Sequence, residues 1–406
     1  MGKLDENLLA AIDVGSAKTC ALVAEISDQG MRYRGHGVSE SRGSRKGQIV
    51  DLEKAIVSIQ RAVELAEKSA EAPMERALVG VAGAQIRGVN SHGGISLGGR
   101  AREIARDDIR AAIDKARAIA MPADREVLHL LPQEFIVDQQ TGIRDPAGML
   151  ASRLEVKVHL VTAAASASQN VVSALNRAGI HVDDTVFEGL ACADSVLRAD
   201  ERELGVCLAD IGAGSTDAVV FYEGAVAHTA VVPIGGDHFT NDVAVGLRTP
   251  LAEAEKIKRL FGCAMVTRIP EGNEIEVPSV GDRPSRLMPQ RLLGEILEPR
   301  ARELFEMLRD NLRHSGALEL CGAGVVLTGG GARLAAMAEI ADSVLRRPAR
   351  VAAPVALARM PASLAAPEFA AAIGMIVYGH RGRLARGTQE QGIGGKLKAF
   401  FAKKGN

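Results

Sequence analysis

Continuous apolar runs that end at glycine-containing turns are the strongest pattern in the chain. Residues 8–26 (LLAAIDVGSAKTCALVAEI) run from one apolar stretch through the turn DVGS into a second apolar stretch. Residues 203–225 (ELGVCLADIGAGSTDAVVFYEGA) repeat this order. Short apolar runs bounded by glycine turns are typical of buried strands. The pattern therefore predicts two strand–turn–strand hairpins of the same design.

The two predicted turns carry residues that suit a phosphate group. Glycines and small residues leave backbone N–H groups free to point into one space, which is a common anion site. The acids that close the strands, Asp13 and Asp210, are candidates to hold a hydrated Mg²⁺ ion through water. One such hairpin is more often a simple turn, whereas two predict half-domains that face one ligand. The candidate ligand-binding residues are Asp13, Gly15, Ser16, Ala17 and Lys18 in the first hairpin and Asp210, Gly212, Ala213, Gly214, Ser215 and Thr216 in the second.

A third glycine turn follows a predicted buried strand late in the chain. Residues 324–334 (GVVLTGGGARL) lead from apolar residues into Gly329, Gly330 and Gly331 and then into a predicted helix. Three glycines allow the backbone to approach a flat ring or a sugar without interference from side chains. The turn is neither a P-loop nor a dinucleotide fingerprint, because the chain has no GxxxxGK[ST] and no GxGxxG that opens a helix.

Periodicity predicts further elements between these turns. Residues 51–70 show a helical apolar period with Asp51 as N-cap, and residues 77–83 are predicted as a strand. From there to residue 162 we expect a small α+β insertion, with a helix near 107–120 and strands in LHLLPQEFIVD and LEVKVHLVT. A helix is predicted over 291–313, preceded by short strands in the segment 264–290, which is rich in proline and glycine.

Composition narrows the classes of function. The 406 residues allow two or more domains, and 47% hydrophobic with 24% charged residues is typical of a globular protein. A net charge of −1 gives no support for nucleic-acid binding. The five cysteines are scattered and are expected to be reduced and buried. We expect a cytoplasmic chain, because no apolar run reaches the roughly 18–20 residues of a spanning helix and the N-terminus lacks a secretory pattern.

The ordered set of two Asp/Gly hairpins and a late TGGG loop resembles the actin/Hsp70/sugar-kinase ATPase superfamily. Within it, the chain is most similar to the bacterial cell-division protein FtsA. The stretches that carry this resemblance extend from end to end: GSAKTCALVAEI, SRGSRKGQIVDLE, VLHLLPQEFIVD, KVHLVT, DERELGVCLADIG, AEKIKRLFGCA, EVPSVGDRP and EILEPRARELF. The sequence departs from the superfamily pattern at Ala213, where a glycine is common.

The resemblance implies an α/β, actin-like, two-lobed fold. Its duplicated RNase H-like halves would carry an inserted strand–helix–strand–strand (SHS2) subdomain and a C-terminal amphipathic helix. The implied parts are lobe 1 (1–82, 163–194 and about 357–380), the SHS2 insert (83–162), the lobe 2 core (195–235 and about 317–356), the lobe 2 small subdomain (236–316), a flexible linker (381–391) and the membrane helix (392–406).

The same resemblance implies an ATP/ADP and Mg²⁺ site between the lobes, with at most a slow ATPase coupled to polymerisation. Glu188 in VFEGLACADS is placed to orient an attacking water, although an acid there also suits a helix N-terminus. Gly235 and Gly236 form a further glycine turn. Glu255 and Lys258 are expected to reach the ribose and base, or else to form an exposed ion pair.

Partners also follow from the resemblance. The lobe 2 small subdomain would bind the C-terminal tail of the tubulin-like protein FtsZ through Arg291, Arg300 and Asn241, unless these residues only form a solvated face. The insert would contact neighbouring copies of the chain and late division proteins. Two other members of the superfamily remain as alternatives: an actin-like protein of the type IV pilus platform and a small-molecule kinase.

The segment GIGGKLKAFFAKKGN (392–406) has the pattern of an interfacial membrane helix. Apolar side chains recur at helical spacing, and lysines lie mostly off that face. We expect weak, reversible binding to anionic lipid at the cytoplasmic face of the inner membrane, at the division septum. The candidate membrane residues are Ile393, Lys396, Leu397, Lys398, Phe400, Phe401, Lys403 and Lys404.

Overall fold

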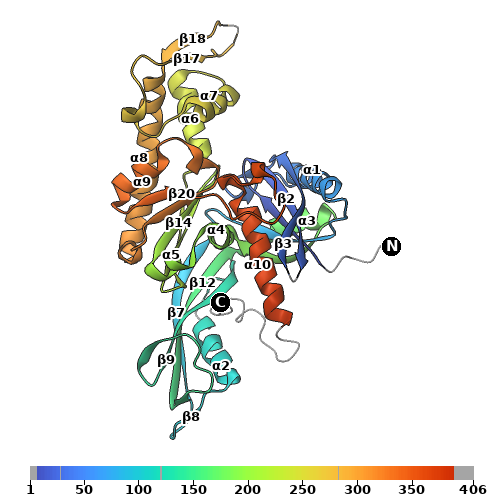
Figure 1. Ribbon diagram of the computed structural model, residues 1–406, viewed down its shortest axis with the longest axis vertical. Helices are drawn as coiled ribbons and strands as arrows, with labels where there is room; N and C mark the ends of the chain where they lie inside the picture. The colour runs from blue at the N-terminus through green and yellow to red at the C-terminus, as the bar shows by residue number, and fades with distance from the viewer. Residues whose placement is uncertain (1–6, 28, 119–120, 282, 388–406) are drawn as a thin grey trace.

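The computed structural model describes residues 7–27, 29–118, 121–281 and 283–387. Two lobes, each built on a five-stranded sheet, form the centre of the molecule, and two smaller parts project from them (Figure 1). The lobe 1 sheet contains β1 (Leu8–Val14), β2 (Lys18–Ser27), β3 (Gly30–Glu40), β6 (Arg76–Val81) and β13 (His181–Phe187). The lobe 2 sheet contains β14 (Val206–Ile211), β15 (Thr216–Tyr222), β16 (Ala225–Val232), β19 (Val325–Thr328) and β20 (Ala349–Val351).

The two sheets have the same topology. In lobe 1, β1, β2 and β3 form an antiparallel meander, and β6 and then β13 join it in parallel next to β1. In lobe 2, β14, β15 and β16 form the meander, and β19 and β20 take the parallel positions. The two predicted hairpins are β1–β2 and β14–β15. The expected duplication of the fold is therefore confirmed.

Helices on both faces of the lobe 1 sheet explain its continuous apolar runs. One face of β1 packs with α1 (Leu52–Ala70) and α3 (Ala165–Arg177), and the other with α4 (Glu188–Val196) and α10 (Ala370–Gly387). Successive residues of β1 point to opposite faces, so both alternating sets must be apolar. The predicted cap of α1 is also present, because the Asp51 carboxylate accepts a hydrogen bond of 3.2 Å from the Lys54 N–H.

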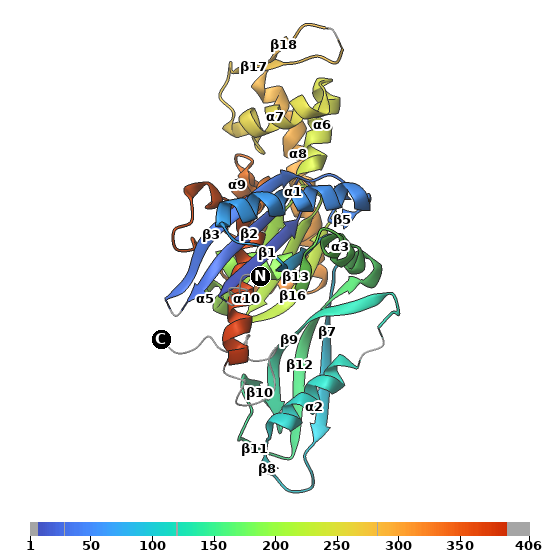
Figure 2. The same cartoon turned by 90° about the vertical axis from the view of Figure 1, so that its right-hand side faces the viewer.

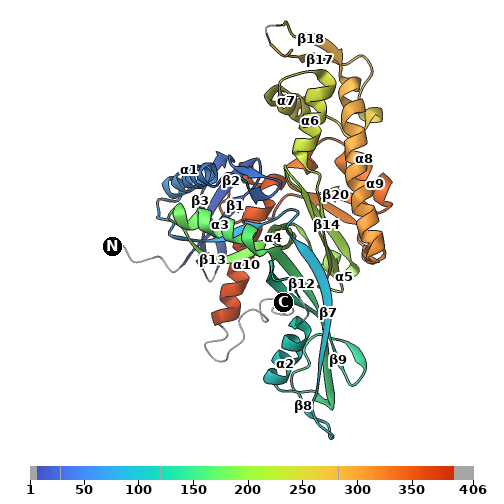
Figure 3. The same ribbon diagram turned by 180° about the vertical axis from the view of Figure 1, so that it is seen from behind.

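Lobe 2 carries a helical subdomain at one end. It contains α6 (Gly236–Leu247), α7 (Leu251–Phe261), the hairpin β17 (Glu274–Val277) and β18 (Arg286–Pro289), and most of α8 (Gln290–His314). Seen from behind, α8 descends beside the lobe 2 sheet and lies next to α9 (Met337–Leu345) (Figure 3). The apolar face of α8 therefore joins this subdomain and the lobe 2 sheet in one hydrophobic core.

The insert between β6 and α3 contains the expected strand–helix–strand–strand order together with one additional edge strand, β10 (Gln140–Ile143). Its strands are β7 (Arg87–Ser96), β9 (Arg125–Val137), β10 (Gln140–Ile143) and β12 (Arg153–Ala164), in the sheet order β10-β9-β12-β7, and α2 (Arg106–Arg117) covers one face (Figure 2). The short strands β8 (Arg102–Glu103) and β11 (Leu150–Ala151) pair at its tip. The remaining elements are β4 (Ser44–Arg45), β5 (Gln48–Ile49), α5 (Ala199–Leu204) and the 3-10 turns Val266–Arg268, Ala317–Leu320, Gly330–Arg333, Ala362–Leu364 and Pro367–Phe369.

The end of α10 differs from the sequence-based expectation. A flexible linker was expected over 381–391, but the helix continues to Gly387. Arg381 forms an ion pair with the buried Asp194, and Arg383 donates a hydrogen bond of 2.6 Å to the Leu8 carbonyl oxygen. These tertiary contacts stabilise the last turns of α10, where the polar sequence does not by itself predict a helix. The expected membrane residues (393–404) lie outside the described residues, and none of the helices within the described ranges has the length and apolarity to cross a bilayer.

Candidate functional site

The three glycine turns converge between the two lobes. A Cβ atom at Gly214 would lie 2.5 Å from Lys46 Cα and 3.0 Å from Ser16 Oγ, which places the second hairpin against the first. A Cβ atom at Gly329 would lie 2.2 Å from Asp210 Oδ1, which places the third turn against the second hairpin. Only glycine permits these approaches. The structure thus brings the three predicted turns to one place.

Four carboxylates occupy the space between the hairpins. Asp13, Glu188 and Asp217 are each less than a tenth exposed. Burial raises the pKa of Asp13, and burial together with neighbouring acids raises the pKa of Glu188 well above its usual value. The pKa values of Asp210 and Asp217 rise to about 6 and about 7, mainly through burial. So many buried acids in one place favour the binding of a cation.

Asp217 was missed by sequence reasoning. It lies directly opposite Asp210 in the β14–β15 register, so both side chains emerge on the same face of the hairpin. Its carboxylate accepts a hydrogen bond of 3.0 Å from the Gly83 N–H and lies 3.5 Å from Ser215 Oγ. The available signal was an acid in an otherwise apolar strand (TDAVVFY).

Lys18 lies between the acids and the third turn. Its Nζ donates a hydrogen bond of 2.5 Å to the Glu368 carbonyl oxygen and lies 4.2 Å from the centre of the Phe369 ring. The neighbouring Pro367 carbonyl accepts a hydrogen bond from the Gly329 N–H. The one cation predicted in the first hairpin therefore lies beside the turn that was expected to receive a sugar or a ring.

Glu188 is the first residue of α4 and faces the acid cluster. A Cβ atom at Gly80 of β6 would lie 2.4 Å from Glu188 Oε1, so glycine is needed to make room for the carboxyl group. Four residues further along α4, the thiol of Cys192 donates a hydrogen bond of 3.3 Å to Asp210 Oδ2. The position agrees with both interpretations of Glu188, a helix N-terminal acid and a water-orienting group.

Two predicted hydroxyl residues have internal roles. Thr216 is fully buried, and its hydroxyl donates a hydrogen bond of 2.8 Å to the Ile234 carbonyl oxygen. Ser16 Oγ accepts a hydrogen bond of 3.0 Å from the Gly47 N–H. The Thr216 hydroxyl therefore has a structural role, because its hydrogen bond joins β15 to the segment that leads into Gly235.

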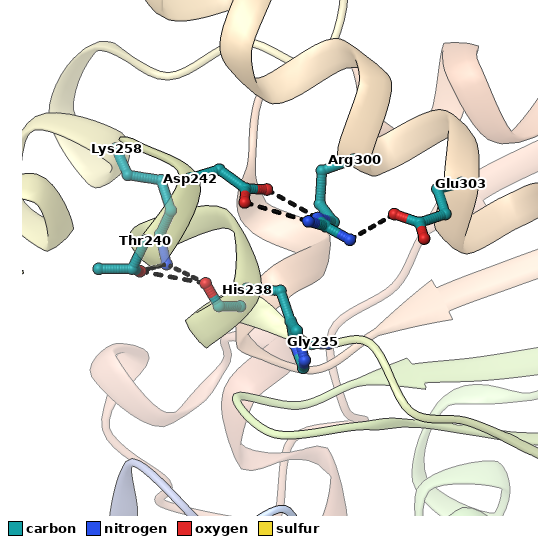
Figure 4. Close-up of polar contacts among 8 residues, drawn as sticks. Gly235, His238, Thr240, Asp242, Lys258, Arg300 and Glu303 are labelled. Atoms are coloured by element: carbon teal, nitrogen blue, oxygen red, sulfur yellow. Dashed lines mark hydrogen bonds and ion pairs between the residues drawn. The ribbon is translucent and has the colours of Figure 1, made fainter. Parts of the chain in front are cut away.

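Gly235 and Gly236 are tied to the second hairpin, and the Lys258 amine lies beside Thr240 at this turn (Figure 4). The Gly236 N–H donates a hydrogen bond of 2.9 Å to the Gly212 carbonyl oxygen. Lys258 Nζ donates hydrogen bonds to Gly236 O (3.0 Å) and Thr240 Oγ1 (2.8 Å) and pairs with Glu255 at 2.5 Å. The Lys258 side chain is only 12% exposed. Glu255 and Lys258 thus belong to a partly buried network at the edge of the site, not to an exposed pair on a helix surface.

The predicted partner-binding residues lie on α6 and α8, away from the acid cluster. Arg300 donates hydrogen bonds of 2.7 and 3.0 Å to the two oxygens of Asp242 and also pairs with Glu303 (Figure 4). Arg291 is half exposed and pairs loosely with Glu295 at 3.8 Å, and Asn241 is exposed. Arg300 therefore has a structural role that the sequence did not reveal, since it joins α8 to α6.

Within the described ranges, no group of three or more His, Cys, Asp or Glu side chains has an arrangement that could hold a metal directly. All five cysteines are buried, as expected. The acids Asp13 and Asp210 remain candidates for contact with a metal through water, as predicted from the sequence.

Two matching lobes with opposed Asp/Gly hairpins define an actin-like protein with an inserted SHS2 domain. Among solved structures, the chain resembles the PilM–PilN type IV pilus biogenesis complex (TM-score 0.65, 17% identity, 92% of this chain and 98% of that chain). It also resembles MreB5 of Spiroplasma citri bound to ADP (TM-score 0.54, 12% identity, 92% and 96%). At these identities the likeness shows the fold alone.

Sequence comparison identifies the family. The family description "Cell division protein FtsA" matches residues 207–374, and "SHS2 domain inserted in FTSA" matches residues 83–162. Cell division protein FtsA of Pseudomonas aeruginosa is 44% identical over 92% of this chain and 89% of its own length. FtsA of Escherichia coli is 36% identical over 94% and 92%. The chain belongs to the FtsA family of cell-division proteins.

Proposed function

We propose that the chain binds ATP or ADP with Mg²⁺ between its lobes. The observation that carries this proposal is the convergence of three glycine turns around four acids, three of which are buried. The turns leave backbone N–H groups without flanking side chains, which suits phosphates, and the acids favour a hydrated cation beside them. The solved structure of MreB5 bound to ADP has the same fold and adds support.

Each group of candidate residues has a separate role in the proposed nucleotide site. Backbone groups of Gly15–Lys18 and Gly212–Thr216 hold the phosphates, and Asp13 and Asp210 hold the waters of the metal ion. The glycines 329–331 and the Glu255–Lys258 pair border the nucleoside. When bound, Mg²⁺ and the triphosphate supply a polarised, cleavable phosphate bond. Glu188, whose pKa is raised by burial and by the neighbouring acids, would orient a water toward that bond.

We further propose that the protein is a self-associating membrane adaptor. The tail residues 392–406 bind anionic lipid at the cytoplasmic face of the inner membrane, and the helical subdomain binds the FtsZ C-terminal tail, so that the FtsZ ring is anchored at the septum. The insert contacts neighbouring copies and later division proteins. Membership of the FtsA family and the amphipathic pattern of the tail support this role.

Two measurements test these proposals. ATP titration followed by fluorescence of a labelled nucleotide tests the site, with Gly329→Ala as the disruptive variant and Gly99→Ala, in the insert, as the control; a chain without saturable ATP binding would contradict the nucleotide site. Liposome flotation of the full chain and of Phe400→Glu tests the tail, with Phe400→Trp as the matched control. We expect Phe400→Glu to stay at the bottom of the gradient and to bind ATP normally. Equal flotation of Phe400→Glu and the unmodified chain would contradict the membrane role.

A further inference from the structure

The four residues at which the chain enters the insert, Ala82–Gln85, are held by both hairpins. We call this segment the insert root. It follows β6 directly and precedes β7, so any movement of the root is passed to the first strand of the insert. A Cβ atom at Gly83 would lie 2.6 Å from the Lys46 carbonyl oxygen, and Gly83 has φ of +86°. The root is thus packed tightly against the β4–β5 turn.

The first hairpin reaches the root through this turn. Ser16 Oγ accepts a hydrogen bond of 3.0 Å from the Gly47 N–H. The Gly47 carbonyl oxygen in turn accepts one of 3.4 Å from Gln85 Nε2, which also donates a bond of 2.9 Å to the Ala82 carbonyl oxygen. Gln85 is only 4% exposed. A buried amide therefore joins the β4–β5 turn to the root.

The second hairpin reaches the same segment directly. Asp217 accepts a hydrogen bond of 3.0 Å from the Gly83 N–H, and both groups are buried. Asp217 belongs to β15, whereas Gly83 follows β6, so this bond joins lobe 2 to the start of the insert, directly after lobe 1. A buried bond from a backbone N–H to a carboxylate is among the stronger hydrogen bonds in proteins.

From the root, hydrogen bonds continue into the body of the insert. Arg125 at the start of β9 donates bonds of 2.9 Å to the carbonyl oxygens of Gln85 and Thr162, and a bond of 3.0 Å to Thr162 Oγ1. Thr162 lies near the end of β12 and donates to the Arg87 carbonyl oxygen at the start of β7. One arginine therefore joins the root to three strands of the insert.

The insert also rests on lobe 2 at a separate place. His159 of β12 lies 2.7 Å from Thr229 Oγ1 on β16, and Gln133 of β9 donates a hydrogen bond of 2.8 Å to the Val226 carbonyl oxygen. The ends of β7, β9 and β12 near the lobes approach β16 (Figure 2). The insert is thus attached covalently to lobe 1 but packed on lobe 2, so it must respond when the lobes move relative to each other.

We propose that the insert root transmits nucleotide occupancy to the insert, through Ser16–Gly47–Gln85 on one side and Asp217–Gly83 on the other. The proposal rests on the nucleotide site proposed above. A ligand that draws the two hairpins together changes the distance between Ser16 and Asp217, and both are bonded to the same four residues. Because packed cores rearrange between discrete arrangements and do not deform continuously, the root and Arg125 must shift as a unit.

Hydrogen exchange of the full chain, with and without Mg²⁺ and ATP, tests the proposal. In the unmodified chain we expect exchange in 82–87 and in 125–131 to slow together by about fivefold or more, the lower end of typical coupling between sites. Gln85→Met removes the amide but keeps the size of the side chain. It should bind ATP with nearly unchanged affinity, keep slower exchange at the hairpins and lose the response in 125–131. Gln60→Met, on the exposed face of α1, is the control and should behave like the unmodified chain.

The outcomes separate this inference from the proposed function. If ATP binds and 125–131 does not respond in the unmodified chain, or responds equally in Gln85→Met, the root is not the relay and the nucleotide site stands. The measurement on the unmodified chain decides the matter even if Gln85→Met does not fold. If ATP does not bind at all, the proposed nucleotide site fails and the relay fails with it.

Discussion

Gly329 is the position at which one added methyl group should most disturb the proposed nucleotide site. It begins the third glycine turn with φ of +81° and ψ of 168°, a combination that is almost restricted to glycine. A Cβ atom there would lie 2.2 Å from Asp210 Oδ1 and 2.6 Å from the Ile211 carbonyl oxygen. Gly329→Ala therefore combines backbone strain with a clash against an acid of the site.

The expected loss of stability follows from the backbone strain and the steric clash. The backbone conformation costs an alanine about 1–3 kcal/mol. Overpacking against a backbone oxygen and a carboxylate costs about 1–3 kcal/mol more. We expect the free energy of unfolding to fall by roughly 2–6 kcal/mol. If about 2 kcal/mol of this remains in the folded protein as displacement of Asp210, ATP affinity falls about 30-fold.

The matched control is Gly99→Ala, in the insert between β7 and β8 and outside the nucleotide site. A Cβ atom at Gly99 would meet nothing within 4 Å. Urea unfolding and ATP titration in the presence of Mg²⁺ should therefore separate the two variants clearly. If Gly329→Ala unfolds at the same urea concentration as Gly99→Ala and binds ATP as well, the third turn does not have the proposed role in nucleotide binding.

Three further predictions concern other parts of the chain. Glu188→Gln should abolish ATP hydrolysis with little loss of ATP affinity, because the amide keeps the size of the side chain but has no carboxylate to accept a proton from the attacking water; unchanged turnover would exclude a water-orienting role. Burial lowers the pKa of His159 from 6.5 to about 3, so its contribution to stability is complete above pH 6.5 and is lost as the pH falls toward 3. Between pH 7 and pH 5, urea unfolding should show that the unmodified chain loses about 2 kcal/mol of stability relative to His159→Gln. The comparison with the variant removes the opposite contribution of Asp210 and Asp217, whose raised pKa values favour the folded state as the pH falls. Arg291→Ala should weaken binding of an FtsZ-tail peptide, measured by fluorescence anisotropy, without changing stability. Arg300→Ala should weaken binding and also reduce stability by about 1 kcal/mol, because it releases Asp242; a peptide that binds both variants normally would remove these arginines from the proposed interface.

Much of the fold could be predicted from local sequence because its strongest signals are local. The hairpins β1–β2 and β14–β15 show as paired apolar runs, since helices cover both faces of each sheet. The helix α1 shows both a clear period and its Asp51 cap. The extension of α10 to Gly387 could not be predicted, because Arg381 and Arg383 are held there by Asp194 and Leu8, which are distant in sequence. Contacts of this kind leave no periodic pattern.

The candidate site, like the fold, could be predicted from the sequence only in part. The three glycine turns could be identified from the sequence, because each one ends an apolar run, and the structure places them together between the lobes. Asp217 could not be identified from the sequence. Its role depends on its register opposite Asp210 and on a hydrogen bond from Gly83 at the start of the insert. The spacing of Glu255 and Lys258 predicts an ion pair but does not show that Gly236 receives the lysine as well. Strand register and contacts between lobes are properties of the folded chain.

The weak membrane binding expected of a single tail becomes effective only if several copies of the chain assemble. Partial burial of four apolar side chains yields about 6–8 kcal/mol, and each lysine near anionic lipid adds about 1 kcal/mol. Ordering some ten residues costs roughly 1 kcal/mol or more apiece, so one tail binds with a balance near zero. In the proposed assembly, many tails on one filament would bind together, because each bound copy raises the effective concentration of the next. If nucleotide occupancy also positions the insert, and the insert contacts the next copy, membrane attachment becomes linked to the nucleotide site by mass action. A tail of higher affinity would remove this control, since single copies would then remain on the membrane whatever their nucleotide.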